Sequence, residues 1–295
     1  MSREIRNPQS AIRISELPIG IFDSGVGGLT VYRALHERLP NERFIYLGDT
    51  ARVPYGTKSL STVERYAIEN ARFLAARGIK LLIVACNTAS ALALPAIRKA
   101  LNVAVIGVIE PGVRAAVRLA AGKPIGVIAT EATIGSKAYR RAIAGLDPTI
   151  EVIERACPLF VSLAEEGWGE TDVARTVARE YLTEFREASV GALVLGCTHY
   201  PILREVIGET VGPALPLIDS GEATACEVES FLASREMARA GRLETRRREL
   251  CDDLDHFYVT DAAQRFARVA ERFLGATPSV LEAVEVWGHD ELRTH

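Results

Sequence analysis

The sequence lacks the long apolar segments that mark membrane and secreted proteins. No apolar run in the 295 residues approaches the roughly 20 residues that span a bilayer. The N-terminus also has no apolar stretch of the kind found in signal peptides. We therefore expect a cytoplasmic protein without a membrane partner.

Cysteine is scarce, and its spacing fits neither a disulfide framework nor a zinc finger. The chain has 5 cysteines, an odd number, and none belongs to a CxxC pair. They are Cys86, Cys157, Cys197, Cys226 and Cys251. A Cys-Thr-His sequence at 197–199 offers two metal ligands, but no nearby cluster supplies the others. We expect free thiols in a reducing compartment and no bound metal.

An excess of positive charge is also absent. The formal net charge is −3, and acidic side chains are interleaved with basic ones. No broad basic face is predicted, so nucleic acid is not an expected partner. Hydrophobic residues make up 48% of the chain, which is enough for a substantial core in one or two domains.

From residue 18 onward, short runs rich in Val, Ile and Leu alternate with longer stretches of helical periodicity. This alternation is typical of βα units and predicts an α/β fold with parallel sheets. Because the runs are apolar at successive positions, we expect strands that are buried on both faces. The predicted strands cover residues 18–23, 43–48, 80–86, 103–108, 124–129, 150–154, 191–197 and 215–218.

Two parts of the sequence are repeated. PIGIFDSGVGG at 18–28 parallels PIGVIATEATIGS at 124–136, and LLIVACNTAS at 81–90 parallels ALVLGCTHYP at 192–201. The repeat predicts two pseudo-symmetric domains, each a mostly parallel sheet flanked by helices. Ligands bind beyond the carboxyl ends of parallel strands, so we expect the site in the cleft between the domains.

The domain boundaries follow from this repeat. We expect an extension at 1–17 that is loosely ordered, a first domain at 18–109 plus 219–275, a second domain at 110–218 and a tail at 276–295. Within the last third, residues 223–249 look helical and highly charged, and the basic cluster at 246–248 with the acidic residues after it predicts a solvated helix and loop. Residues 257–274 predict a helix packed on a sheet through Phe266, Val269, Ala270 and Phe273.

Cys86 ends an apolar run and is followed by polar residues suited to capping a helix. A helix N-terminus can lower the pKa of a thiol from about 8.5, which would make a thiolate available near neutral pH. A lone cysteine at a strand end is more often an inert small hydrophobe. The equivalent cysteine of the second repeat favours catalysis.

That second cysteine, Cys197, is followed by Thr198, His199 and Tyr200. An imidazole two residues from a thiol could shuttle a proton or hold the thiol in a required ionisation state. The simpler alternative is a buried cysteine beside a capping threonine and a core histidine.

Asp23 and Ser24 precede a glycine-rich turn at the end of the first predicted strand. Such a backbone can approach a ligand closely, and amides at a helix start suit a carboxylate or phosphate. The turn matches neither GxxxxGK[ST] nor GxGxxG, because position 30 is Thr, so a nucleotide phosphate is disfavoured. Asp23 suits an ammonium group or could assist a thiol, and an N-cap is the alternative.

Two further turns carry hydrogen-bonding groups. Pro54, Tyr55 and Gly56 form one loop, and Thr130 with Thr133 is the second-repeat counterpart of the glycine turn. Their hydroxyls and backbone amides could bind a second carboxylate, although each alone is more often turn chemistry.

Seven segments taken together resemble the glutamate racemases of the aspartate/glutamate racemase superfamily. They are FDSGVGGLTV (22–31), GDTARVPYG (48–56), ACNTAS (85–90), VIEPG (108–112), CPLFVSLAEEG (157–167), LGCTHYP (195–201) and LIDSG (217–221). Two cysteine motifs in register with the aspartate-glycine turn make the resemblance specific. Two departures stand out: Ala129 and Ala132 replace glycines of the family's GTxGTI turn, and Ser162 replaces the proline of CPLFVPL.

The resemblance implies an isomerase that interconverts L- and D-glutamate in the interdomain cleft, without pyridoxal phosphate, another cofactor or a metal. It also implies a homodimer that supplies D-glutamate for peptidoglycan synthesis. Cys86 and Cys197 would be the acid/base catalysts, with Asp23 assisting the first thiol and His199 and Glu165 the second. The substrate-binding residues would be Asp23, Ser24, Pro54, Tyr55, Gly56, Asn87, Thr88, Thr130, Thr133, Thr198 and His199.

The chemistry supports a pair of bases. Inverting a carbon requires one proton to leave one face and another to arrive at the opposite face, so one thiol must begin as thiolate and the other as thiol. Without an electron sink, hydroxyls and amides of Ser24, Asn87, Thr88 and Thr198 would stabilise the developing charge. Three alternatives remain open: an aspartate racemase or single-cysteine decarboxylase, an inactive module that binds an amino acid or a protein, and a dinucleotide enzyme.

Overall fold

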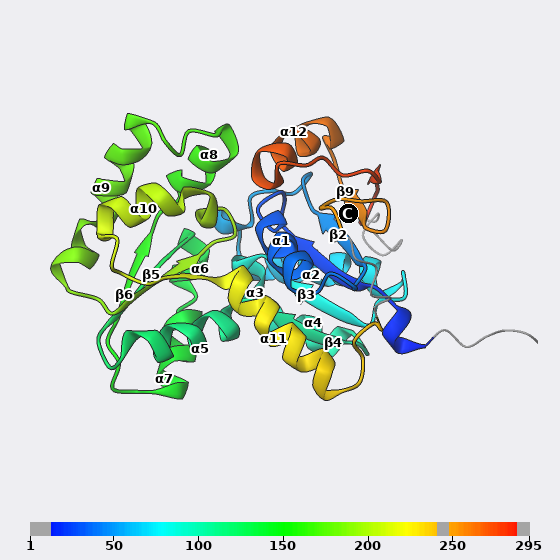
Figure 1. Cartoon of the computed structure of the whole chain (residues 1–295), viewed down its shortest axis with the longest axis horizontal. Coiled ribbons are helices and arrows are strands. Elements are labelled where there is room, and N and C mark those ends of the chain that lie inside the picture. Colours follow the sequence, from blue (N-terminus) through cyan, green and yellow to red (C-terminus); the bar gives the residue numbers. More distant parts are fainter. Residues whose placement is uncertain (1–12, 241–247, 288–295) are drawn as a thin grey trace, which may run out of the picture.

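The computed structural model describes residues 13–240 and 248–287, which form two lobes around two separate sheets (Figure 1). The first sheet has the strand order β10-β9-β2-β1-β3-β4 and the second has the order β6-β5-β7-β8, and all neighbouring strands are parallel. The α/β class with two mostly parallel sheets is therefore confirmed. The strands are β1 (Ile19–Asp23), β2 (Phe44–Gly48), β3 (Leu81–Val84), β4 (Ala104–Gly107), β5 (Ile125–Ala129), β6 (Val152–Ala156), β7 (Ala192–Gly196), β8 (Leu217–Asp219), β9 (His256–Val259) and β10 (Leu281–Ala283).

Helices flank both sheets. The α-helices are α1 (Leu29–Arg38), α2 (Leu60–Ala75), α3 (Asn87–Leu92), α4 (Leu94–Ala100), α5 (Ile109–Ala120), α6 (Glu131–Gly135), α7 (Ala138–Leu146), α8 (Leu159–Glu166), α9 (Asp172–Glu187), α10 (Arg204–Val211), α11 (Ser220–Ser234) and α12 (Ala263–Leu274). Short 3-10 turns are η1 (Ile14–Glu16), η2 (Tyr55–Thr57) and η3 (Tyr200–Leu203). No helix in the described part of the chain is long and apolar enough to cross a membrane.

The internal repeat reappears as a shared strand order. Strands β2-β1-β3-β4 of the first sheet correspond to β6-β5-β7-β8 of the second. Every residue of β1, β3, β5 and β7 is buried, as the apolar runs predict. Strands β4, β6 and β8 are only partly buried, so the prediction of burial on both faces was wrong for these strands at the sheet edges. The two central strands of each four-strand repeat therefore lead into equivalent turns: Asp23 ends β1 as Thr130 follows β5, and Cys86 follows β3 as Cys197 follows β7.

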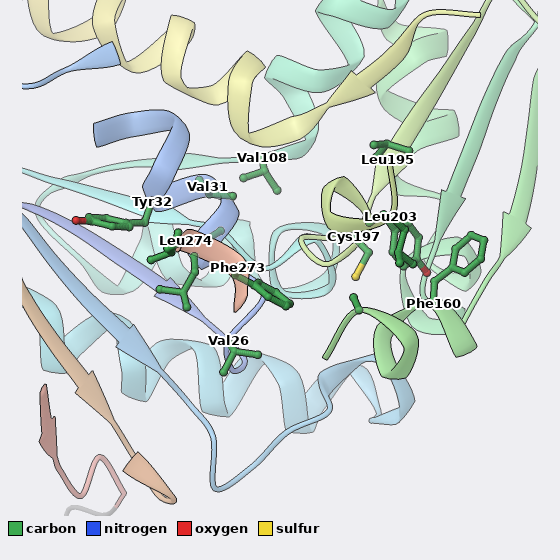
Figure 2. Packing of buried hydrophobic residues seen from close by; sticks show 14 of the residues in the cluster. Val26, Val31, Tyr32, Val108, Phe160, Leu195, Cys197, Leu203, Phe273 and Leu274 are labelled. Carbon is green, nitrogen blue, oxygen red and sulfur yellow. The ribbon is translucent and has the colours of Figure 1, made fainter. Parts of the chain in front are cut away.

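The hydrophobic core continues from one lobe into the other. One cluster of buried side chains includes Val26 and Phe273 from the first lobe and Phe160 and Leu195 from the second, and Cys197 lies between these groups in Figure 2. Helix α11 packs on both α1 and α5 and so also joins the lobes (Figure 1). This shared packing holds the two sets of strand ends toward each other.

The last third of the chain differs in part from the prediction. Residues 257–259 belong to strand β9 and not to the predicted helix, which begins at Ala263 and buries Phe266, Val269, Ala270 and Phe273 as expected. The predicted helix at 223–249 ends at Ser234, and residues 241–247 lie outside the described part. The unassigned tail contributes β10, which pairs with β9 at the edge of the first sheet.

The charged cluster near residue 250 is not simply solvated. Arg248 pairs with Asp252 at 2.6 Å and with Asp255 at 2.7 Å. Asp255 is fully buried, and its carboxylate also accepts hydrogen bonds from the Tyr32 hydroxyl and the Phe44 backbone. Burying a carboxylate without such partners would cost several kcal/mol, so the ion pairs are part of the core and the prediction of a solvated loop was wrong here.

Candidate active site

The carboxyl ends of both sheets meet at one cavity of about 180 Å³. Pockets for drug-sized ligands measure roughly 300–1,000 Å³, so this cavity suits a small substrate. It is lined by residues of both lobes: Ser24, Val53, Pro54, Tyr55, Gly56, Thr57, Cys86, Asn87, Thr88, Thr130, Glu131, Pro158, Val161, Ser162, Cys197, Thr198 and His199. Both predicted thiols therefore reach the same cavity from equivalent positions in the repeat.

Cys86 sits at the N-terminus of α3, where its sulfur accepts a hydrogen bond from the Ala89 amide at 3.5 Å. The thiol itself donates to the Ser24 hydroxyl at 3.5 Å. Burial and the neighbouring charge of Asp23 nevertheless raise the pKa of Cys86 to about 12. The expectation that the helix N-terminus would lower this pKa was therefore wrong. Within the described residues a single backbone amide, that of Ala89, reaches the sulfur, and desolvation outweighs this contact.

Asp23 is fully buried and lies close enough to Cys86 to affect the pKa of its thiol. One carboxylate oxygen accepts the Gly25 amide at 2.9 Å, while the other has no hydrogen-bond partner among the described residues. Burial raises the pKa of Asp23, although the nearby His199 and turn amides oppose this shift. Helix α1 takes Gly28 as its N-cap, so the alternative of Asp23 as the cap of that helix is wrong.

Cys197 faces a histidine-carboxylate pair. The sulfur is 3.7 Å from Nδ1 of His199, and Nε2 of the same ring is 3.0 Å from Oε1 of Glu165. Burial opposes charging of this imidazole, but its hydrogen bonds with Cys197 and Glu165 raise its pKa to about 10. Although burial opposes ionisation of Glu165, the His199 partner holds the pKa of that carboxyl below its usual value. The ring is therefore positioned to donate Nδ1–H to the Cys197 sulfur.

Three threonine hydroxyls join the lobes on one side of the cavity. Thr88 from the first lobe lies 3.0 Å from Thr130 and 3.1 Å from Thr133 of the second lobe, and those two hydroxyls are 3.0 Å apart. Nearby, Asn87 donates its amide to the Tyr139 hydroxyl at 2.8 Å. The buried Asn87 carbonyl oxygen has no partner in the described chain, which leaves an acceptor available for a ligand.

The structure brings nearly all predicted site residues together. Asp23, Glu165 and Thr133 do not line the cavity. Asp23 affects the pKa of Cys86, Glu165 contacts His199, and Thr133 contacts Thr88. Sequence reasoning missed Val53, Thr57, Glu131, Pro158 and Val161 as lining residues, and it noted Ser162 only as a departure from a family pattern. Val53 and Thr57 flank the loop at 54–56, and the others lie in or beside motifs already singled out. Their proximity to each motif was the available signal.

Comparison with known proteins gives a consistent result. A profile of the family described as Asp/Glu/hydantoin racemase matches residues 19–228. A glutamate racemase of Geobacter metallireducens is 54% identical over 257 residues, covering 87% of this chain and 92% of the relative. A second glutamate racemase, from Lactiplantibacillus plantarum, is 45% identical and covers 88% of this chain and 93% of the relative.

Solved structures are also similar. The glutamate racemase of Francisella tularensis, determined in complex with D-glutamate, aligns with a TM-score of 0.83 at 41% identity and covers 92% of this chain and 98% of its own. The glutamate racemase of Thermus thermophilus, in complex with beta-chloro-D-alanine, aligns with a TM-score of 0.79 at 44% identity and covers 92% and 97%.

Proposed function

Because the chain belongs to the Asp/Glu/hydantoin racemase family, we propose that it interconverts L- and D-glutamate through proton exchange between Cα and the thiols of Cys86 and Cys197. The observation that carries this proposal is the pair of cysteines from equivalent strand ends that line one small cavity. Its relatives at 44–54% identity are named glutamate racemases, which supports glutamate as the substrate.

The two thiols have different partners, which suggests different roles in one direction of the reaction. Cys86, with a pKa near 12, begins as a thiol and can return a proton to Cα. We assign the role of base to Cys197, because the imidazole beside it is protonated at neutral pH and can donate a hydrogen bond to its sulfur. After one turnover the thiol and thiolate have changed places, and a reaction in the opposite direction restores them. Asp23 would assist proton movement at Cys86, while His199 and Glu165 would assist at Cys197.

Substrate contacts are proposed from the free hydrogen-bonding groups of the cavity. The unpartnered carbonyl oxygen of Asn87, which lines the cavity, suits the substrate ammonium group. Hydroxyls of Ser24, Thr88 and Thr198 would hold the α-carboxylate and stabilise the charge that develops on it as the proton leaves. The loop of Pro54, Tyr55 and Gly56 and the hydroxyl of Thr130 would enclose the substrate, and Thr133 would hold Thr88 and Thr130 in place. No cofactor is needed in this scheme, since the two thiols and these donors supply every proposed role.

The experiment is nuclear magnetic resonance of the purified chain with L-glutamate in heavy water, together with circular dichroism of the product. We expect loss of the α-proton signal and decay of optical activity, with roughly 10²-fold or larger losses in Cys86→Ser and Cys197→Ser. Cys251→Ala is the matched control, because Cys251 is also buried but lies outside the cavity. Glutamate that binds without exchange would favour the binding-module alternative, and exchange with L-aspartate alone would favour an aspartate racemase.

Several wider assignments belong to the same proposal. We assign a cytoplasmic location from the five unpaired cysteines, and a role in supplying D-glutamate for peptidoglycan synthesis. We divide the chain at residues 110 and 218, with β10 added to the first domain because it pairs with β9.

We also propose a homodimer, supported by the half-exposed Leu159, Trp168 and Val173 near α8 and α9. Light scattering in solution tests the dimer, and a monomeric mass would refute it.

A further inference from the structure

A buried polar cluster lies behind the loop that forms one wall of the cavity. It consists of Asp49, Arg52, Tyr55, Asn70 and Thr260. Asp49 and Asn70 are completely buried, and Asp49 is not among the residues that line the cavity. A carboxylate in such a place is costly unless each oxygen is satisfied, so its partners indicate what it holds in position.

Asp49 connects three segments that are distant in sequence. Its Oδ2 atom accepts hydrogen bonds from the Tyr55 hydroxyl and from the Asn70 amide of α2, the latter at 3.1 Å. Its Oδ1 atom accepts the hydroxyl of Thr260, which follows β9, at 3.0 Å. The Arg52 guanidinium pairs with the same carboxylate at 2.8 Å. One fixed negative charge therefore ties the loop at 52–55 to the framework of the first lobe.

The anchored loop is in contact with the second lobe. A Cβ atom on Gly56 would lie 2.9 Å from Cβ of Thr130, so the backbone of the loop lies directly against the threonine turn. The Tyr55 hydroxyl is bonded to Asp49, while the residue also lines the cavity. A shift of Tyr55 would therefore move the cavity wall and alter the contact with Thr130.

We propose that Asp49 is a positioning residue that holds Tyr55 and Gly56 in the positions required to bind the substrate. This inference rests on the proposed racemisation of glutamate and concerns its binding step. Asp49 would act through Tyr55, not on the reacting carbon, so its loss should weaken substrate binding more than it slows the chemical step.

The chain provides its own control for this proposal. Asp255 is an equally buried carboxylate that accepts a tyrosine hydroxyl, that of Tyr32, and pairs with an arginine, Arg248. It precedes β9 and bonds the amide of Phe44 at the start of β2, whereas Asp49 follows the end of β2. The two clusters thus lie at opposite ends of the same strands, and only the Asp49 cluster is next to the cavity.

The test compares Asp49→Asn, Tyr55→Phe and their double variant with Asp255→Asn, using KM and kcat for L-glutamate and amide hydrogen exchange of the loop at 52–58. We expect KM to rise about tenfold in Asp49→Asn and Tyr55→Phe, with a much smaller change in kcat. The double variant should add little, because both substitutions remove the same contact. Loop amides should exchange faster in both single variants. Asp255→Asn should lower the melting temperature and leave KM and loop exchange unchanged.

The proposal would be overturned if Asp49→Asn and Asp255→Asn had the same KM and the same rate of loop exchange. It would also be overturned if the KM increase in the double variant equalled the product of the increases in the two single variants. If Asp49→Asn does not fold, Tyr55→Phe removes only the hydroxyl and decides the question through the same two readouts. A wild-type chain that does not act on glutamate would refute the proposed function. The loop exchange of the variants would still decide the positioning role, since it requires no activity.

Discussion

Nε2 of His199 lies 3.0 Å from Oε1 of Glu165, although the two residues come from different motifs and both are largely buried. The pairing raises the pKa of His199 and lowers that of Glu165, so both partners are charged at neutral pH. This ion pair places a positive charge beside Cys197, whereas Cys86 has the buried carboxyl group of Asp23 for a neighbour. The two thiols occupy equivalent positions in the repeat and yet have different electrostatic surroundings.

The His199–Glu165 pair should make stability depend on pH. The pKa of His199 is raised from 6.5 to about 10 in the folded chain, so its contribution is full below pH 6.5 and is lost as pH rises through 10. We expect the free energy of unfolding to fall across this window more steeply in the wild type than in Glu165→Gln. Urea denaturation at several pH values measures both slopes, and parallel slopes would contradict the assignment.

Asp23 should control the ionisation of Cys86. Because the charge of Asp23 contributes to the raised pKa of this thiol, Asp23→Asn should lower that pKa and increase reactivity at neutral pH. Alkylation by iodoacetamide over a range of pH, read by mass spectrometry of the Cys86 peptide, measures the change. The exposed Cys226 is the internal reference, and its profile should not move. An unaltered Cys86 profile would mean that burial alone sets the pKa.

Gly27 should be required for the close approach of the two lobes beside Cys197. A Cβ atom there would clash with the Thr198 hydroxyl and lie 2.5 Å from the His199 ring, so Gly27→Ala should displace the second lobe and reduce kcat/KM at least tenfold. Gly145→Ala is the matched control, since a methyl group at that position would have no neighbouring atom within 4 Å. It should stabilise helix α7 by about 0.5–1 kcal/mol and preserve activity. Equal activity of the two variants would refute the close approach.

Arg265 should make a small, salt-sensitive contribution. Its guanidinium is 3.1 Å from Oε2 of Glu165, but 63% of the side chain is exposed. Exposed ion pairs contribute up to about 1 kcal/mol, so Arg265→Ala should cost no more than this. Because screening is strong at ~1 M salt, the difference in melting temperature between variant and wild type should shrink there. A loss of kcat as large as that of Glu165→Gln would instead place Arg265 in the catalytic machinery.

Local patterns in the sequence were sufficient for much of the fold. All eight predicted strands are present, because short runs rich in apolar residues that alternate with stretches of helical periodicity are typical of βα units. Strand β9 was missed because its four residues run into the amphipathic pattern of α12 after a short turn. Strand β10 has no buried residue to produce a pattern at all.

The repeat and its cysteine motifs were readable from the chain alone, since residue type and order specify which groups follow each strand. The pKa values of those groups could not be predicted from the sequence, because burial and the distances to other charges depend on the packing of the folded chain. Helix-terminus reasoning predicted a lowered pKa for Cys86, while desolvation in the assembled lobes raises it to about 12. Likewise, only the folded chain brings Asp49 into contact with Tyr55 and Thr260, and Glu165 into contact with His199. Hydrogen bonds and ion pairs depend on the distance between atoms in space, which the spacing of residues in the sequence does not give.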